Sequence, residues 1–85
     1  MLKIVRIETG NGAEGLRLEG RVIGPWVDEL RRSCEPFLAT GATLTLDLSD
    51  VSFVDRDGVE LFRRLRTHHV ALSNCSPFVA EQLKA

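Results

Sequence analysis

The chain has 85 residues, of which 44% are hydrophobic and 27% are charged, and its 11 basic and 12 acidic residues give a net charge of −1. This length predicts a single small domain over residues 1–85, which excludes a multi-domain enzyme and leaves little room for a deep substrate cavity beside the core. The balanced charge, with no basic stripe among aromatic residues, argues against nucleic acid as the main partner.

The N-terminal part of the chain predicts two antiparallel strands. Leu2 to Glu8 is rich in β-branched residues, which indicates the first strand. Asn11-Gly12 can supply the positive φ angles of a reversing turn. The second strand has the two-residue period of a half-buried strand. Its apolar positions are Leu16, Leu18 and Val22, and its polar positions are Arg17, Glu19 and Arg21.

Gly24-Pro25 marks the start of a first helix, because proline is well tolerated at the first helical position. Apolar residues follow at spacings of three and four, which predicts that one side of this helix covers a sheet. These residues are Val27, Leu30, Cys34, Phe37 and Leu38. Pro36 predicts a kink or a break near Glu35, since a proline inside a helix removes a hydrogen bond. Gly41 is expected to end the helix.

A third strand is predicted at Thr43–Leu48, where leucine alternates with polar residues. The segment Ser49–Gly58 is predicted to be its exit loop, and functional groups gather in such loops at the carboxyl ends of parallel strands. Asp57 and Glu60 have the spacing of the N-cap and N3 residues in a capping box. A second helix is therefore expected to begin near Gly58, with Asp57 as its cap.

The second helix ends in a basic run, which suits the negative end of the helix dipole. The run contains Arg63, Arg64, Arg66, His68 and His69. Two interpretations remain open for it. It is either a solvated helix end or a docking surface for an acidic partner, with Arg63, Arg64 and Arg66 as the candidate contact residues.

The remaining residues complete a repeating order of strands and helices. Val70–Leu72 predicts a fourth short strand, and Ser76-Pro77 begins a final helix that continues through Leu83. The order β-β-α-β-α-β-α predicts an α/β fold with a small mixed sheet, in which the strands joined by helices are parallel.

Other features favour a cytoplasmic, non-enzymatic protein. The first residues lack the apolar stretch of a signal peptide, and no apolar run approaches the about 20 residues of a membrane span. Cys34 and Cys75 have no C-x-x-C spacing, so they are interpreted as reduced thiols. We also find no nucleophile with a neighbouring base, no P-loop and no Rossmann glycine pattern, so no enzyme activity and no cofactor are expected.

The stretch LDLSDVSFVDRDG, from Leu46 to Gly58, resembles the motif of the STAS domain family, which includes anti-sigma factor antagonists and the tails of sulfate transporters. The family commonly reads D-L-S-x-V-x-F-[IV]-D-[ST]-[ST]-G here. The residues that match are Asp47, Leu48, Ser49, Val51, Phe53, Val54, Asp55 and Gly58. The resemblance implies a small α/β fold with helices mainly on one face of the sheet.

The resemblance also implies a regulated position at Asp57. In the family, the residue before the glycine is commonly a serine or threonine that a partner kinase, itself an anti-sigma factor, phosphorylates to break their complex. Here Arg56 and Asp57 replace the two hydroxyl residues. Three interpretations of Asp57 are open: a helix N-cap, a fixed mimic of a phosphate, or a phosphoacceptor aspartate.

Four aspartates lie close together in the sequence and raise the question of a metal site. They are Asp47, Asp50, Asp55 and Asp57. Carboxylates can hold a hard cation such as Mg²⁺, but turns and helix caps favour aspartate without any metal. We expect caps and turn residues here, and no metal.

Two functions follow from the resemblance. The first is a protein-binding module of the anti-sigma factor antagonist type, whose loop Asp55, Arg56, Asp57 and Gly58 contacts an anti-sigma factor or kinase. The alternative is a small accessory subunit of an ABC transporter for lipids, with the transporter ATPase as its partner. Family members commonly run past this length, so an edge of the sheet and the last helix are expected to depend on a partner or on a second copy in a homodimer.

Overall fold

The computed structural model describes residues 2–8 and 13–84. The elements are β1 (Leu2–Glu8), β2 (Glu14–Val22), α1 (Pro25–Thr40), β3 (Leu44–Val54), α2 (Arg56–Thr67), β4 (Ala71–Ser73) and α3 (Pro77–Lys84). This order confirms the predicted α/β pattern, while the turn predicted at Asn11-Gly12 lies outside the described residues. Within those residues, no helix is both long enough and apolar enough to cross a membrane.

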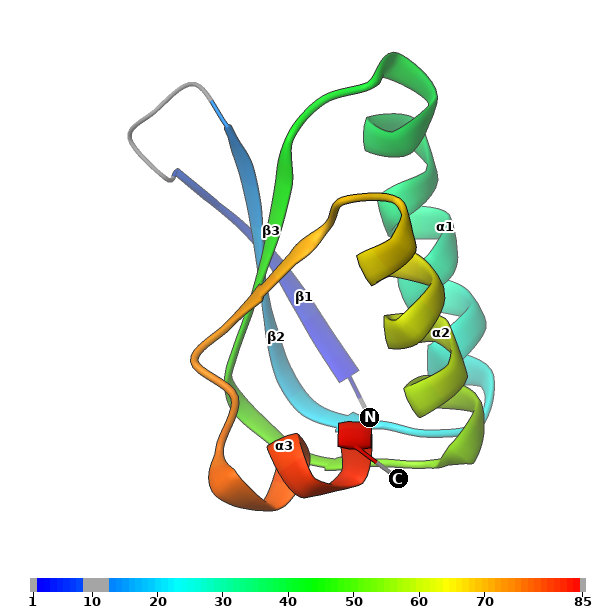
Figure 1. Cartoon of the computed structure of the whole chain (residues 1–85), viewed down its shortest axis with the longest axis vertical. Helices are drawn as coiled ribbons and strands as arrows, with labels where there is room; N and C mark the ends of the chain where they lie inside the picture. The colour runs from blue at the N-terminus through cyan, green and yellow to red at the C-terminus, as the bar shows by residue number, and fades with distance from the viewer. Residues whose placement is uncertain (1, 9–12, 85) are drawn as a thin grey trace.

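The described strands form one mixed sheet in the order β1-β2-β3-β4. β1 pairs antiparallel with β2, whereas β2 with β3 and β3 with β4 are parallel, as predicted for strands that a helix connects. Figure 1 shows α1 and α2 side by side on one face of this sheet, with α3 near the carboxyl end of β3. The carboxyl ends of β2 and β3 therefore lie beside the first turns of α1 and α2.

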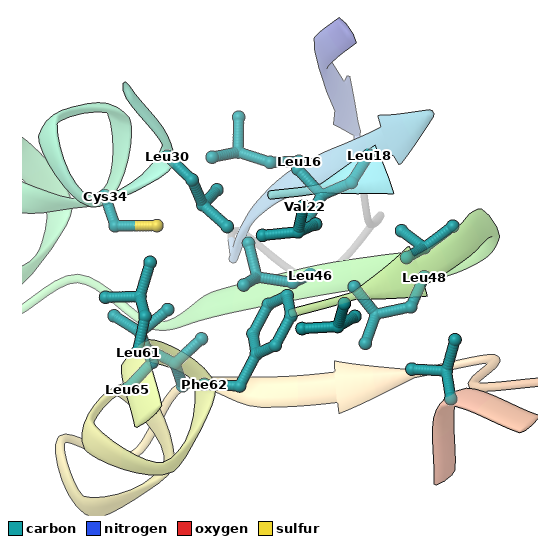
Figure 2. Close-up of a cluster of buried hydrophobic side chains, with 14 of the residues drawn as sticks. Leu16, Leu18, Val22, Leu30, Cys34, Leu46, Leu48, Leu61, Phe62 and Leu65 are labelled. Atoms are coloured by element: carbon teal, nitrogen blue, oxygen red, sulfur yellow. The ribbon is translucent and has the colours of Figure 1, made fainter. Parts of the chain in front are cut away.

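The core lies between the sheet and the two long helices. Leu44, Leu46 and Leu48 alternate along β3 and are buried, and the Phe62 ring of α2 points toward Leu46 and Leu48 (Figure 2). Within the described residues the buried side chains are all apolar. The apolar side chains that recur every two residues in the strands therefore pack against those that recur every three to four residues in the helices, and together they form one apolar layer.

Cys34 belongs to this core, as its place on the apolar face of α1 predicted. Its side chain is fully buried, and this burial raises the pKa of the thiol to about 11. The thiol therefore stays protonated at neutral pH and packs as a small apolar group. Cys34 and Cys75 are both free cysteines.

β3 is longer than predicted. It continues to Val54, so the exit loop predicted at Ser49–Gly58 is wrong for most of its length. The reason is an irregular register with β2: Arg17 lies opposite Asp47, whereas Glu19 lies opposite Asp50. A second shift follows, since Gly20 lies opposite Val51 and Arg21 lies opposite Phe53. Each shift adds one residue to β3 and interrupts the alternation of apolar side chains, as in a β-bulge, so that Val51 and then Val54 return to the core.

α1 is one continuous helix. It runs from Pro25 to Thr40 with Pro36 inside it, so of the two outcomes predicted near Glu35, a kink or a break, the break does not occur. The side chains that precede and follow Pro36 pack on the same core, which outweighs the loss of one backbone hydrogen bond. Gly41 ends the helix as predicted, in a left-handed conformation with φ 72°.

Candidate functional site

The candidate site is the junction between β3 and α2. Val54 ends the strand and Arg56 begins the helix, so only Asp55 lies between them. The junction is at the carboxyl end of a parallel strand, where the sequence placed it. It brings Asp55, Arg56, Asp57 and Gly58 together within the first turn of α2.

Asp55 joins the starts of two helices through its carboxylate. One oxygen, Oδ1, accepts a hydrogen bond from the backbone N–H of Gly58 at 2.8 Å, and the other, Oδ2, accepts one from Gly24 N–H at 2.8 Å. The backbone N–H of Asp55 donates to the carbonyl oxygen of Val22 at 3.0 Å. Asp55 therefore caps α2 and fixes it to the segment between β2 and α1.

This geometry corrects the predicted cap. Asp55, not Asp57, is the N-cap residue, and α2 begins at Arg56 rather than near Gly58. Asp55 has the extended backbone that an N-cap needs, with φ −82° and ψ −179°. The hydrogen bond from Gly58 N–H to the Asp55 side chain joins residues three apart, which is the spacing of an N-cap and N3 residue that was predicted for Asp57 and Glu60. The earlier aspartate takes the role because β3 runs directly up to it.

Gly58 is a site of close packing. A Cβ at this position would lie 2.6 Å from Val54 Cγ1 and 2.9 Å from the carbonyl oxygen of Val22. Gly58 is buried, so the glycine of the motif lets the first turn of α2 approach β2 and β3. Asp55, which is partly buried, and Gly58, which is buried, thus form the half of the junction that holds the fold.

Arg56 and Asp57 form the exposed half of the junction. Asp57 lies in the first turn of α2, where its negative charge suits the positive end of the helix dipole. It borders a shallow hollow of about 300 Å³ between α1 and α2. The other residues that line this hollow are Val27, Arg31, Glu60, Leu61 and Arg64.

The three predicted basic residues of α2 are exposed, but they lie on two different sides of the helix. Arg64 lines the hollow that faces α1, together with Asp57. Arg63 lines a hollow with Gln82 of α3, and Arg66 lines another with Lys84 of α3. The basic run therefore does not form one surface, because successive residues of a helix point in different directions.

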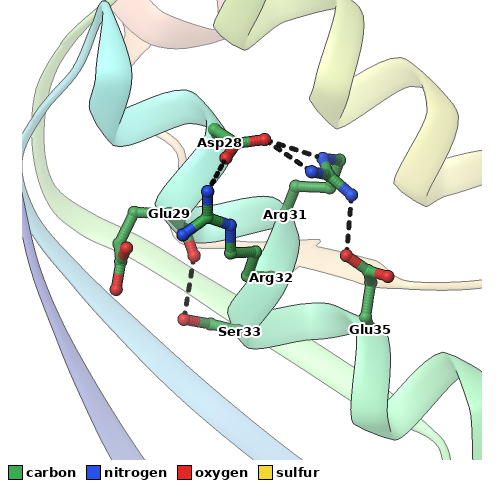
Figure 3. Close-up of polar contacts among 6 residues, drawn as sticks. All are labelled: Asp28, Glu29, Arg31, Arg32, Ser33 and Glu35. Atoms are coloured by element: carbon green, nitrogen blue, oxygen red, sulfur yellow. Dashed lines mark hydrogen bonds and ion pairs between the residues drawn. The ribbon is translucent and has the colours of Figure 1, made fainter.

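The charged side chains of α1 and α2 differ in how many ion pairs they form within their own helix. On α1, Arg31 pairs with Asp28 at 2.6 Å and with Glu35 at 2.7 Å, and Arg32 pairs with Asp28 at 2.7 Å (Figure 3). The hydrogen bond from Arg31 lowers the pKa of Asp28 below its ordinary value. On α2 the described ion pairs include one long contact, of 3.6 Å between Arg63 and Glu60. Charge on α1 is thus largely satisfied internally, and charge on α2 is not.

The four aspartates considered for a metal site do not come together. Asp55 uses both oxygens on backbone amides, as described above. Asp47 accepts hydrogen bonds from Ser49 N–H and from the Asn74 amide, and the Ser49 contact is the main cause of its lowered pKa. Within the described residues, no group of three or more histidine, cysteine, aspartate or glutamate side chains is placed to hold a metal ion.

An exposed aromatic pair was not predicted from the sequence. The rings of Phe53 and Phe78 lie with centroids 6.2 Å apart, and the two side chains are 39% and 56% exposed. Gln82 of α3 holds this region together, since its side chain donates to the carbonyl oxygen of Val54 and accepts from Val54 N–H. Phe53 belongs to the stretch that the sequence treated as a loop, so its neighbours could not be inferred there.

Comparisons with known proteins agree with this architecture. A family model described as the STAS domain matches residues 5–85. The unphosphorylated form of the anti-sigma factor antagonist SpoIIAA has a similar structure, with a TM-score of 0.75 and 20% identity over 96% of this chain and 82% of that chain. The phosphorylated form of SpoIIAA, a Bacillus cell fate determinant, gives a TM-score of 0.74 and 19% identity over 96% and 81% of the two chains.

A more distant structure has the same fold. It is an uncharacterised protein from Shewanella loihica PV-4, from the DUF3478 family and with a SpoIIAA-like fold, at a TM-score of 0.60 and 12% identity over 91% of this chain and 69% of that chain. Among curated protein sequences, none matches this chain. At these identities the structures establish the fold, and the family model covers nearly the whole sequence. The chain therefore belongs to the STAS domain family.

Proposed function

We propose that this chain is a non-enzymatic protein-binding module that acts in the cytoplasm as an adaptor of the anti-sigma factor antagonist type. The observation that carries the proposal is the exposed first turn of α2 at the end of β3, with Arg56 and Asp57 at its surface. This turn is rigidly held by Asp55 and Gly58, so it presents a fixed shape to a partner. A preformed surface loses little conformational entropy on binding.

Asp57 is proposed to act as a permanent contact charge at the position where the family commonly has a hydroxyl, and not as a substitute for the phosphate that breaks the complex. Its carboxylate lies at the positive end of α2, and its single charge is smaller than the ~−1.5 to −2 of a phosphate. Within the described residues the side chain of Asp57 makes no hydrogen bond or ion pair, so its charge is available to a partner. The module is then held in one partner-binding state, without the cycle of phosphorylation that a serine would permit.

Affinity purification from the native host, followed by mass spectrometry, tests this proposal. We expect the wild-type chain to recover an anti-sigma factor or kinase, and Asp57→Lys to reduce that recovery at least about tenfold, because reversing a contacting charge turns attraction into repulsion. Glu29→Lys is the matched control. Glu29 is an exposed acid on α1 whose side chain points away from Arg31 (Figure 3), and it does not line the hollow beside Asp57.

Two results would count against the proposal. Equal recovery of the same protein by the wild type and by Asp57→Lys would remove the junction from the binding surface. Recovery of a transporter ATPase in place of an anti-sigma factor or kinase would favour the accessory-subunit function instead.

A further inference from the structure

Three hollows, of about 450, 420 and 610 Å³, lie along one side of α2, and residues of α3 also line the first and the third. We refer to the three hollows together as the groove. Arg63 lines both the first and the second, and Arg66 lines both the second and the third, so the hollows follow one side of α2. Arg64 is absent from this side because it lies in the hollow that faces α1.

The groove combines apolar walls with a cationic rim. Val59 of α2 and Leu72 and Leu83, from β4 and α3, supply apolar surface. The cationic residues along it are Arg56, Arg63, Arg66 and Lys84. Glu60 is the acidic residue among the lining side chains of the described chain, and it lies 3.6 Å from Arg63.

Apart from Arg63, which lies near Glu60, these cations form no ion pair within the described part of the chain. Among residues 2–8 and 13–84, no carboxylate lies within 4.0 Å of a charged nitrogen of Arg56, Arg66 or Lys84. The arginines of α1, by contrast, are paired within their own helix (Figure 3). The net charge of the whole chain is −1, so the excess of cations in the groove is local.

We propose that this groove binds an acidic amphipathic segment of a partner protein. Carboxylates of that segment contact Arg63 and Arg66, whose planar guanidinium groups suit paired hydrogen bonds to a carboxylate, and its apolar side chains contact Val59 and Leu83. The inference rests on the proposed function and adds the chemistry of the partner. It also adds Lys84 to the predicted contact residues and removes Arg64 from them.

The walls of the groove favour a protein over a nucleic acid. Binding to a phosphate backbone depends on many cations, and single-stranded nucleic acid also needs aromatic rings on which bases stack. None of the described residues that line the groove is aromatic, and aliphatic side chains separate its cations. Aliphatic surface beside cations fits the alternating apolar and acidic faces of an amphipathic helix.

Fluorescence anisotropy with defined probes tests the groove. The main probe is a labelled helical peptide of about four turns with a leucine stripe flanked by glutamates. Three comparison probes are its scrambled isomer, the same peptide with glutamine in place of glutamate, and a single-stranded oligonucleotide. Vesicles of phosphatidylserine and phosphatidylcholine provide an anionic membrane. We expect the wild-type chain to bind the main probe at least about tenfold more tightly than any of the others.

Single charge reversals on α2 locate the binding surface. Arg63→Glu and Arg66→Glu are each expected to weaken binding of the main probe about tenfold, because each places a carboxylate against the acidic face of the peptide. Arg64→Glu makes the same change of charge on the same helix but on the side that faces α1. It is expected to leave the affinity within about twofold of the wild type. Circular dichroism of each variant checks that the fold is retained.

Several outcomes would overturn the inference. They are no measurable binding of the main probe, equal binding of its scrambled isomer, an equal loss in Arg64→Glu, and tighter binding of the oligonucleotide or the vesicles. A different result would contradict the proposed function alone. In that case Asp57→Lys would leave partner recovery unchanged, while the groove would still bind the acidic peptide. If the partner were lost with Asp57→Lys and kept with Arg63→Glu and Arg66→Glu, the binding module would stand and the groove would not be its partner site.

Discussion

Gly58→Ala is expected to lower the free energy of unfolding by about 2 kcal/mol. The new methyl group would meet Val54 Cγ1 at 2.6 Å and the carbonyl oxygen of Val22 at 2.9 Å. Overpacking of a buried site costs about 1–3 kcal/mol, and a contact with rigid backbone places this one at the upper end. Alanine regains about 1 kcal/mol through its higher helix propensity. Urea denaturation followed by circular dichroism measures the net effect.

A double-mutant cycle separates the clash from other effects of the substitution. Val54→Ala removes one of the atoms in the way, so the combined variant should be about 1 kcal/mol more stable than the sum of the two single changes predicts. Gly41→Ala serves as the control, because no atom lies within 4 Å of its Cβ and its cost of about 1 kcal/mol comes from the positive φ angle. Strict additivity of Gly58→Ala with Val54→Ala would contradict the close approach of α2 to the sheet.

Asp55→Ala is expected to destabilise the fold by about 2 kcal/mol. The change leaves two backbone N–H groups, of Gly58 and Gly24, without their acceptor. Loss of an N-cap costs about 1 kcal/mol, and loss of a second hydrogen bond adds about 1 kcal/mol. Because the second bond reaches across to the start of α1, the substitution loosens two helix starts together.

Asp57→Ala provides the comparison for Asp55→Ala. The side chain of Asp57 makes no hydrogen bond within the described residues, so its removal should change the free energy of unfolding by at most about 0.5 kcal/mol, through the helix dipole. Chemical denaturation of both variants decides which aspartate is the cap. A larger loss of stability with Asp57→Ala than with Asp55→Ala would contradict the geometry of the junction.

The sequence correctly predicted those helices and strands whose local residue pattern agrees with their packing in the folded chain. The leucines at positions 44, 46 and 48 alternate, and their strand is central in the sheet. Pro25 begins α1, Gly41 ends it, and Ser76 accepts a hydrogen bond from Val79 N–H at the start of α3. In each case a few adjacent residues carry the whole signal, so no knowledge of distant contacts was needed.

The differences from prediction at β3 and Pro36 come from contacts that are distant in sequence. The two extra residues of β3, one between Asp47 and Asp50 and one between Val51 and Phe53, are accommodated because β2 pairs with β3 on both sides of them. The pattern alone could not reveal this, since a bulge and the end of a strand both interrupt the two-residue period. Pro36 remains helical because residues on both sides of it pack on one core. Tertiary packing overrode the local preference in both places.

The four residues from Asp55 to Gly58 lie together in the first turn of α2, but the cap role predicted for Asp57 belongs to Asp55. The motif did not separate the pair that holds the fold, Asp55 and Gly58, from the exposed pair, Arg56 and Asp57. That division depends on Gly24 and Val22, which lie on another segment of the chain. The groove likewise could not be predicted from the sequence, because the residues that line it come from α2 and α3, which come together only in the folded chain.

The central claim is that the exposed side of α2, beginning at Arg56 and Asp57, is the surface that a partner protein binds. Its most direct test is to add the co-purified partner to the isotope-labelled chain and to record backbone amide shifts by nuclear magnetic resonance. The account predicts that the largest changes fall on Arg56, Asp57 and the following turns of α2. Changes confined to the sheet face away from the helices, at Val5, Arg17 and Asp47, would contradict it.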